Sequence, residues 1–155
     1  MRVVPGLVMT TALCVSPNFS AAEWHIADYH FSHPMFDTDW SKKNALLDKG
    51  LRLTLTPQTS SPNRFLGASV RRERVTHWGR YEARLKAARG SGVITGFFLY
   101  SGPAYGTQHD EIDWEFFGQD TYTAQVAWVK NGQIQEHKIN LGFDAAEDHH
   151  DYAIE

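Results

Sequence analysis

The chain is poor in cysteine and has no excess of basic residues. Its 155 residues include a single cysteine, Cys14. One cysteine cannot form a disulfide within the chain, so the fold must depend on packing. Fifteen lysines and arginines against 18 aspartates and glutamates give a net charge of −3. This balance argues against nucleic acid as a partner, because nucleic-acid-binding domains carry basic patches.

The sequence also lacks an apolar run long enough to cross a membrane. The run from Val3 to Val15 is shorter than the ~20 residues that a transmembrane helix needs. Arg2 before it and the small residues 20–22 after it predict a secretory signal over residues 1–22. We therefore expect a secreted protein, extracellular or periplasmic, with no membrane contact once the signal is removed.

No segment has the periodicity of a helix, and several segments alternate as strands do. Residues 51–56 and 80–86 alternate apolar and polar side chains. Asn131-Gly132 separates two strand-like runs, and both residues readily adopt the positive φ of a tight hairpin. Hydrophobic residues make up 42% of the chain, enough for one domain with a core. Short strands with frequent turns predict an all-β protein, an antiparallel sandwich in a single domain.

The most informative segment is residues 109–118, which read HDEIDWEFFG. It places carboxylates at a spacing of two residues, at Glu111, Asp113 and Glu115, with bulky apolar residues between them. Because alternate residues of a strand share a face, the three acids would line one face of a sheet. A row of like charges is costly, and a purely structural strand would have little reason to carry it.

Two carboxylates that flank an acetal are what glycoside hydrolysis requires, one as nucleophile and one as proton donor. Glutamate side chains are long enough for Glu111 and Glu115 to lean over Asp113, toward the ~5–5.5 Å separation of retaining enzymes. The spacing alone does not say which glutamate has which role. The crowding predicts that one acid is held protonated near neutral pH by the charge of its neighbours.

Other interpretations of the acidic segment are less consistent with its residues. An acidic strand could be solvated, or could discourage pairing at a sheet edge. A cation site is a second option, but the segment lacks the central glycine and the distal glutamate of an EF-hand. In a helix, Asp113 would point away from Glu111 and Glu115, and the β-branched and aromatic residues disfavour that conformation.

The segment resembles glycoside hydrolase family 16, whose signature E-x-D-x-E lies on a jelly-roll strand. The resemblance covers about residues 24 to 155 and implies a concanavalin-like jelly roll. No extra residue separates Asp113 from Glu115, which groups the chain with the lichenase, xyloglucan-transferase and bacterial exopolysaccharide-glycanase branch. Further stretches similar to bacterial lichenases are residues 78–86, 92–108, 141–145 and 150–153.

The resemblance implies a role for each acid. Glu111 would be the nucleophile, Glu115 the general acid/base, and Asp113 the residue that tunes the nucleophile through a hydrogen bond or proton. The substrate-binding residues that it implies are Asp37, Arg71, Phe98, Tyr100 and His109.

Four positions depart from the lichenase pattern. His109 replaces a tryptophan, as in xyloglucan-active relatives, and Asp37 stands where lichenases have an asparagine in the cleft. Ser69 replaces a glutamate and Ala127 another asparagine. These departures concern the choice of polysaccharide rather than the reaction.

We therefore expect a secreted retaining endo-β-glycanase that hydrolyses β-glucan or exopolysaccharide by double displacement. It would need no cofactor for catalysis and no catalytic metal, could bind a structural calcium ion, and would act as a monomer on a polysaccharide. A transglycosylase is the alternative within the same chemistry. A non-catalytic carbohydrate-binding jelly roll is the alternative from another class, although such a module has no use for the three acids.

Members of the family continue for several strands beyond the position of Tyr152, whereas this sequence ends at Glu155. We therefore expect residues 23–155 to form a partial, C-terminally truncated jelly-roll domain that lacks part of the cleft wall. On its own this segment is expected to be poorly soluble and inactive, because uncovered apolar faces and unpaired strand edges cost stability.

Overall fold

The computed structural model describes residues 4–9, 24–47, 50–72 and 76–155. Nine strands of these residues form one large sheet, whose main path runs in the order β12, β11, β10, β9, β1, β7, β2. Neighbours along this path are antiparallel. Their bounds, in that order, are Gln133–Asn140, Thr123–Lys130, Asp110–Phe117, Ile94–Ser101, Val4–Met9, Phe65–Arg72 and Trp24–Ile26.

The remaining strands are short. β3 (Thr38–Trp40) and β6 (Thr56–Pro57) join the large sheet at the start of β7, β3 in the parallel sense. Two further pairs are β4 (Ala45–Leu47) with β5 (Leu51–Leu53), and β8 (Tyr81–Leu85) with β13 (His150–Ile154). Two single 3₁₀ turns are η2 (Lys42–Asn44) and η3 (Pro103–Tyr105).

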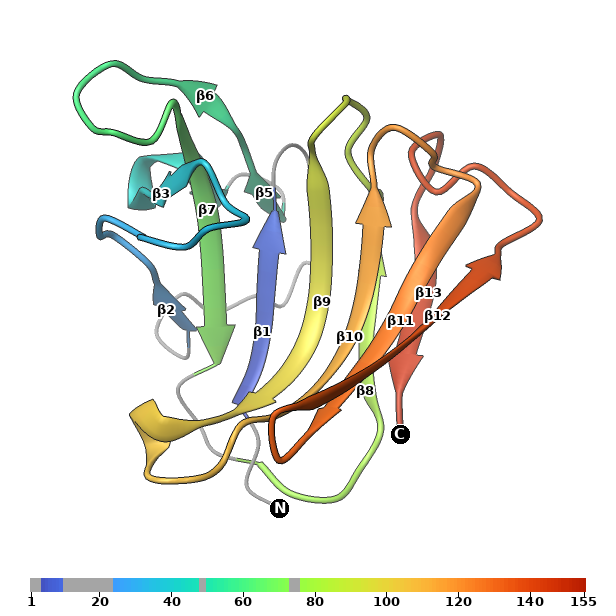
Figure 1. Cartoon of the computed structure of the whole chain (residues 1–155). Coiled ribbons are helices and arrows are strands. Elements are labelled where there is room, and N and C mark those ends of the chain that lie inside the picture. Colours follow the sequence, from blue (N-terminus) through green and yellow to red (C-terminus); the bar gives the residue numbers. More distant parts are fainter. Residues whose placement is uncertain (1–3, 10–23, 48–49, 73–75) are drawn as a thin grey trace.

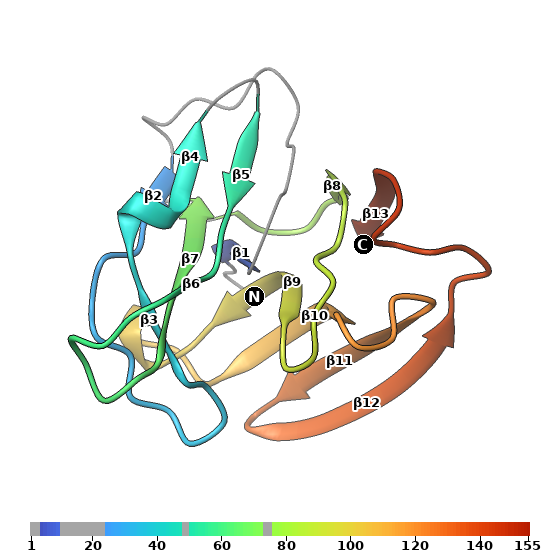
Figure 2. The ribbon, with the colours of Figure 1, turned by 90° about the horizontal axis from the view of Figure 1, so that it is seen from above.

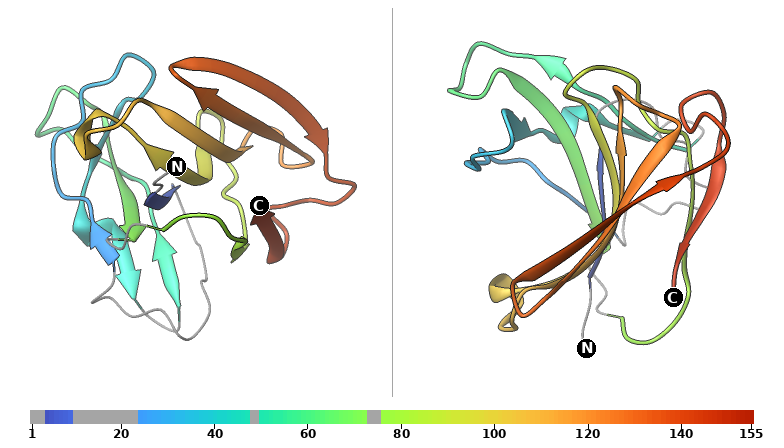
Figure 3. Two further views of the ribbon diagram at one scale, coloured as in Figure 1. Left: turned by 90° about the horizontal axis from the view of Figure 1, so that it is seen from below. Right: turned by 45° about the vertical axis from the view of Figure 1, so that its right-hand side comes forward.

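The strands form two layers. In Figure 1, β8 and β13 pass behind β10 and β11. Viewed from above, in Figure 2, the pairs β8–β13 and β4–β5 lie on the same side of the large sheet. Figure 3 shows the same arrangement from below and from the side. The predicted all-β sandwich is therefore confirmed, with the two small pairs covering one face of the large sheet.

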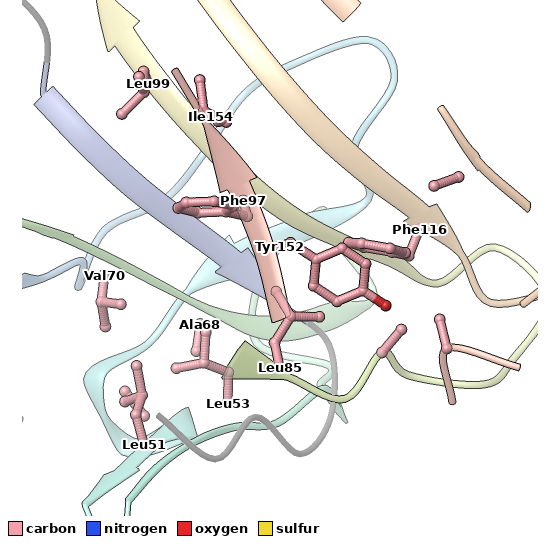
Figure 4. Packing of buried hydrophobic residues seen from close by; sticks show 14 residues of the cluster. Leu51, Leu53, Ala68, Val70, Leu85, Phe97, Leu99, Phe116, Tyr152 and Ile154 are labelled. Carbon is pink, nitrogen blue, oxygen red and sulfur yellow. The ribbon is translucent and has the colours of Figure 1, made fainter. Parts of the chain in front are cut away.

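The core lies between these layers. Leu85 of β8 and Tyr152 of β13 are buried against Phe97 of β9 and Phe116 of β10 (Figure 4). At the other end, Leu53 of β5 lies in the same cluster. Burial of large apolar side chains from both layers provides the main favourable free energy of such a fold.

Alternation along the central strands determines which face each side chain occupies. On β9, Phe97 and Leu99 are buried in the core, whereas Phe98 and Tyr100 are only partly buried. On β10, Phe116 is fully buried, whereas its neighbours Glu115 and Phe117 are only partly buried. We call the face of the large sheet that points away from the core the outer face; it is turned toward the reader in Figure 1.

The predicted hairpin at Asn131-Gly132 is confirmed. Both residues have positive φ, 53° and 77°, and they join β11 to β12 in register. The strand expected over residues 51–56 is interrupted instead. β5 ends at Leu53 and β6 begins at Thr56, while the backbone amide of Thr54 donates to the carbonyl of Asn44, directly before β4.

Part of the predicted secretory signal forms a strand. Val4–Met9 is β1, which pairs with β9 on one side and β7 on the other. The expected cleavage region, residues 20–22, and Cys14 lie outside the described residues. Removal of residues 1–22 therefore stays a prediction. Within the described ranges, no helix has the length and apolar character needed to cross a membrane.

Deletion of residues 1–22 should destabilise the sheet. β1 pairs with β9 at five positions and with β7 at four, so its loss exposes two strand edges inside the sheet. With a net contribution of roughly 0.5–1.5 kcal/mol for each backbone hydrogen bond, we expect the free energy of unfolding to fall by at least about 3 kcal/mol. Urea unfolding followed by tryptophan fluorescence would measure this, with deletion of residues 1–3 as the control. Equal midpoints for the two deletions would show that the sheet does not depend on β1.

Candidate active site

The three acids of β10 lie together on the outer face. Glu111, Asp113 and Glu115 are each partly buried, whereas Phe116 on the other face is fully buried in the core. Trp114 also points inward, and its indole N–H donates to the carbonyl of Ala153 on β13 at 3.0 Å. The predicted arrangement, with acids on one face and aromatic residues on the other, is therefore confirmed.

The antiparallel register aligns the acids with side chains of the neighbouring strands. Residues directly opposite each other in such a sheet point to the same side. In the order Glu111, Asp113, Glu115, the partners on β9 are Tyr100, Phe98 and Gly96, and those on β11 are Val129, Ala127 and Gln125.

Three of the five predicted substrate-binding residues lie next to the acids, and a fourth, Arg71, lies three strands away in the same sheet. Tyr100 and Phe98 lie opposite Glu111 and Asp113 on β9. Arg71 of β7 belongs to the same row as Phe98, because both residues pair with the same position of β1. His109 directly precedes β10 and contacts Glu111.

Glu111 is held by a histidine whose ring packs against that of Tyr100. Its Oε2 lies 2.8 Å from Nε2 of His109. The ring centroid of His109 lies 5.3 Å from that of Tyr100. Burial, followed by the charge of Glu111, raises the pKa of the Tyr100 hydroxyl, which therefore stays a hydrogen-bond donor at neutral pH. Gly102 lies against this hydroxyl, and a Cβ at that position would displace the Tyr100 ring.

Asp113 has the most perturbed acid group of the site. Burial, the charges of Glu111 and Glu115, and a hydrogen bond to Glu111 raise the pKa of Asp113 to about 9. At neutral pH its carboxyl group is protonated and donates to Glu111. One proton placed between the two glutamates relieves the repulsion that three adjacent carboxylates would otherwise produce.

Glu115 has a different set of neighbours. Nε2 of Gln125 donates to its Oε2 at 3.0 Å. Burial raises the pKa of Glu115, this hydrogen bond lowers it, and the charges of Glu136 and Glu111 raise it further. The net direction is upward, which favours the protonated form of an acid that must donate a proton.

Asp37 is placed differently from the other predicted residues. It precedes β3, and its carboxylate accepts hydrogen bonds from the backbone and the guanidinium of Arg64. The backbone N–H of Arg64, followed by its side chain, lowers the pKa of Asp37. Among the described residues, no hydrogen bond or ion pair joins Asp37 to the acids of β10. The structure therefore places Asp37 in the rim of loops beside β7.

A second aspartate organises this rim. Asp39 is buried, and its carboxylate accepts hydrogen bonds from the backbone of Phe31 and the side chains of Gln58 and Asn63. Burial raises its pKa, but the hydrogen bonds outweigh this effect and hold the pKa well below its usual range. Asp39 thereby ties its own segment to residues 58–63, directly before β7.

Gln125 and Glu136 are the site residues that the sequence analysis did not identify. Both lie on the outer face, Gln125 opposite Glu115 and Glu136 opposite Ala127. The hairpin at Asn131-Gly132 was a usable signal, because it fixes the register of β12 on β11. The register of β11 on β10 was also needed, and no turn residue specifies it.

The described residues contain no group of three or more histidine, cysteine, aspartate or glutamate side chains that could hold a metal ion. A structural calcium ion therefore stays a prediction.

The sequence profile described as "Glycosyl hydrolases family 16" matches residues 32–155. A β-glucanase of Paenibacillus macerans is 37% identical over 138 residues, which are 88% of this chain and 58% of that protein. A β-glucanase of Acetivibrio thermocellus is 35% identical over 151 residues, which are 96% of this chain and 45% of that protein. The chain thus spans about half the length of these curated relatives.

Solved structures of β-glucanases are also similar to this chain. The β-glucanase of Bacillus licheniformis superposes with a TM-score of 0.81 at 35% identity, over 93% of this chain and 68% of that one. A β-1,3-1,4-glucanase (lichenase) from a mouse hindgut metagenome gives 0.84 at 35% identity, over 93% and 69%. The predicted jelly-roll fold is confirmed by these similarities.

Replacement of Asp113 should change how stability depends on pH. A carboxyl group with a higher pKa in the folded state makes the folded protein bind more protons than the unfolded chain, so stability falls as the pH rises from about 4 toward 9. Asp113→Asn removes this titration. From pH 5 to pH 8.5 the free energy of unfolding of the parent should therefore fall by at least about 1 kcal/mol more than that of the variant. Urea unfolding at both pH values measures the difference. Asp151→Asn on the exposed side of β13 is the control, and parallel pH dependences for parent and Asp113→Asn would contradict the assignment.

Proposed function

The chain belongs to glycosyl hydrolase family 16, and we propose that it hydrolyses internal β-glycosidic bonds of a polysaccharide with retention of configuration. The observation that carries this proposal is the arrangement on β10: three acids share one face, the middle one is protonated, and the outer two have different partners. Retaining glycosidases need two carboxyl groups in different protonation states.

The proposed reaction is a double displacement. The Glu111 carboxylate attacks the anomeric carbon while Glu115 gives its proton to the glycosidic oxygen, so the bond to the leaving sugar breaks and a glycosyl ester forms on Glu111. Water then attacks the anomeric carbon while Glu115 takes a proton from it, the bond between that carbon and Glu111 breaks, and Glu111 returns as a carboxylate. The proton of Asp113 stays between the acids and orients Glu111 toward the sugar.

The proposed substrate is a β-glucan or a bacterial exopolysaccharide. Support comes from the relatives, which are β-glucanases by name. Phe98 and Tyr100 provide an aromatic surface beside the acids, and Arg71 provides a cation in the row of Phe98. His109, Ser69 and Ala127 differ from the lichenase residues at these positions, and we propose that they set a substrate range different from mixed-linkage glucan.

We further propose that the protein acts outside the cytoplasm as a monomer, without a catalytic cofactor. The apolar run after Arg2 supports secretion, and removal of residues 1–22 on export would also remove β1, so the exported protein would fold without that strand. A bound structural calcium ion is compatible with this proposal, and the change of melting temperature on addition of a chelator tests it.

Replacement of the proposed nucleophile should abolish hydrolysis. In a chain extended to the length of its relatives, we expect Glu111→Ala to lose at least about 1,000-fold in kcat/KM, equivalent to ~4 kcal/mol of barrier. Added azide should partly restore turnover and give a product of inverted configuration, because a small anion can enter the vacated space. The measurement is sugar release together with NMR of the anomeric product.

The control for this experiment is Glu82→Ala on the exposed side of β8. Saccharide binding by Glu111→Ala, measured by calorimetry, distinguishes the binding-module alternative. Near-native turnover by Glu111→Ala would remove Glu111 from the role of nucleophile.

The loss of activity on replacement of the proposed acid should depend on the leaving group of the substrate. Glu115→Gln should reduce hydrolysis of natural polysaccharides by about 100-fold or more, because an alkoxide leaving group needs a proton. Hydrolysis of an aryl glycoside with a good leaving group should fall far less in its first step. Steady-state and burst kinetics on both substrates make this comparison, and equal losses on the two would exclude Glu115 as the acid.

A further inference from the structure

A small hollow opens on the outer face beside Glu115. Its volume is about 180 Å³, smaller than a typical drug-sized pocket and therefore suited to one sugar residue or a substituent. It lies between the end of β10, the turn after it, β11 and β12, toward the right-hand edge of the sheet in Figure 1. The lining residues are Phe117, Gln119, Asp120, Thr123, Gln125 and Lys138.

The position of the hollow relates it to the leaving group. Gln125 both lines the hollow and donates to Glu115, the proposed acid. The groups around Glu111, by contrast, are His109 and Tyr100, toward β9. Since the acid protonates the oxygen of the departing sugar, that sugar would lie over β11 and β12.

Among the described residues that line the hollow, Lys138 is the only cation. It lies opposite Gln125 on β12 and therefore shares the outer face with Glu115. Its side chain is exposed, and among the described residues it makes no ion pair. An ammonium group can only donate hydrogen bonds and carries a full charge, so it favours an anionic partner over a neutral hydroxyl.

The hollow also contains an anion, Asp120, which forms no ion pair with Lys138 among the described residues. Asp120 uses one carboxylate oxygen to accept from the backbone of Tyr122 and the other to accept from the hydroxyl of Thr123. Gln119 is exposed and can donate through its amide, and Phe117 is partly buried at the end of β10. An aromatic ring, two side-chain amides and an ammonium group that is not paired with Asp120 are contacts that a sugar with a carboxylate could use.

We propose that this hollow binds an acidic substituent, such as a uronic or acyl carboxylate, on the leaving-group sugar, and that Lys138 selects for it. This inference rests on the proposed function of the acids. It narrows the substrate class to acidic exopolysaccharides or acidic glucans and assigns Lys138 as a specificity residue that takes no part in bond cleavage.

The kinetic test compares one β-glucan with its carboxymethylated form. Lys138→Gln should lower kcat/KM on the carboxymethylated polymer by about two- to fivefold, the range of an exposed ion pair, and should leave the unmodified polymer unchanged. Lys138→Glu should lower kcat/KM on the carboxymethylated polymer further, by about tenfold. Addition of ~0.5 M NaCl should remove the effects of both substitutions on this polymer. Hydrolysis of an aryl glycoside, whose leaving group does not reach the hollow, should be unaffected.

The control variant is Lys130→Gln. Lys130 is also exposed, at the end of β11, but it points to the other side of the sheet. Equal effects of Lys138→Gln on the two polymers, or an equal effect of Lys130→Gln, would overturn the inference.

A binding measurement keeps the inference testable apart from catalysis. A glucuronate-containing oligosaccharide added to Glu111→Ala should shift the side-chain amide NMR signals of Gln119 and Gln125, and Lys138→Gln should weaken this binding. Shifts that are absent, or insensitive to Lys138→Gln, would reject the site. Failure of the proposed function would give a different result, because the parent protein would then hydrolyse none of the substrates.

Discussion

The packing of β10 against β13 is the constraint on which the site depends. Trp114 donates its indole N–H to Ala153, and Phe116 meets the ring of Tyr152 at a centroid distance of 4.7 Å. These inward contacts fix the outward direction of Glu111, Asp113 and Glu115. A slip of one residue in the register of β10 would bury the acids and expose the aromatic residues, so core packing and site geometry are one requirement.

The second requirement is electrostatic. Three carboxylates at a spacing of two residues repel one another, and partial burial increases that cost. Protonation of Asp113 reduces this repulsion, and the outer acids have separate partners, His109 for Glu111 and Gln125 for Glu115. This asymmetry distinguishes two glutamates that the sequence spacing leaves equivalent.

Much of this arrangement could be predicted from local sequence. The alternation in residues 111–116 specified both faces of β10, and Asn131-Gly132 specified the β11–β12 hairpin. Contacts between distant segments could not be predicted in this way. The attachment of Asp37 to Arg64 depends on the pairing of β3 with β7, and Gln125 reaches Glu115 only through the register of β11 on β10. The position of Val4–Met9 in the sheet is likewise a tertiary effect that an apolar run does not encode.

The central claim is that Glu111 forms a covalent bond to the sugar. A 2-deoxy-2-fluoro glycoside with a good leaving group tests it directly, because the fluorine destabilises the oxocarbenium-like transition states and slows breakdown of the ester. Mass spectrometry of the digested protein should show one fluoroglycosyl group on a peptide that contains residues 109–118, and fragmentation should place the group on Glu111. A label on Asp113 or Glu115, or turnover of the unfluorinated substrate with no label at any residue, would contradict the account.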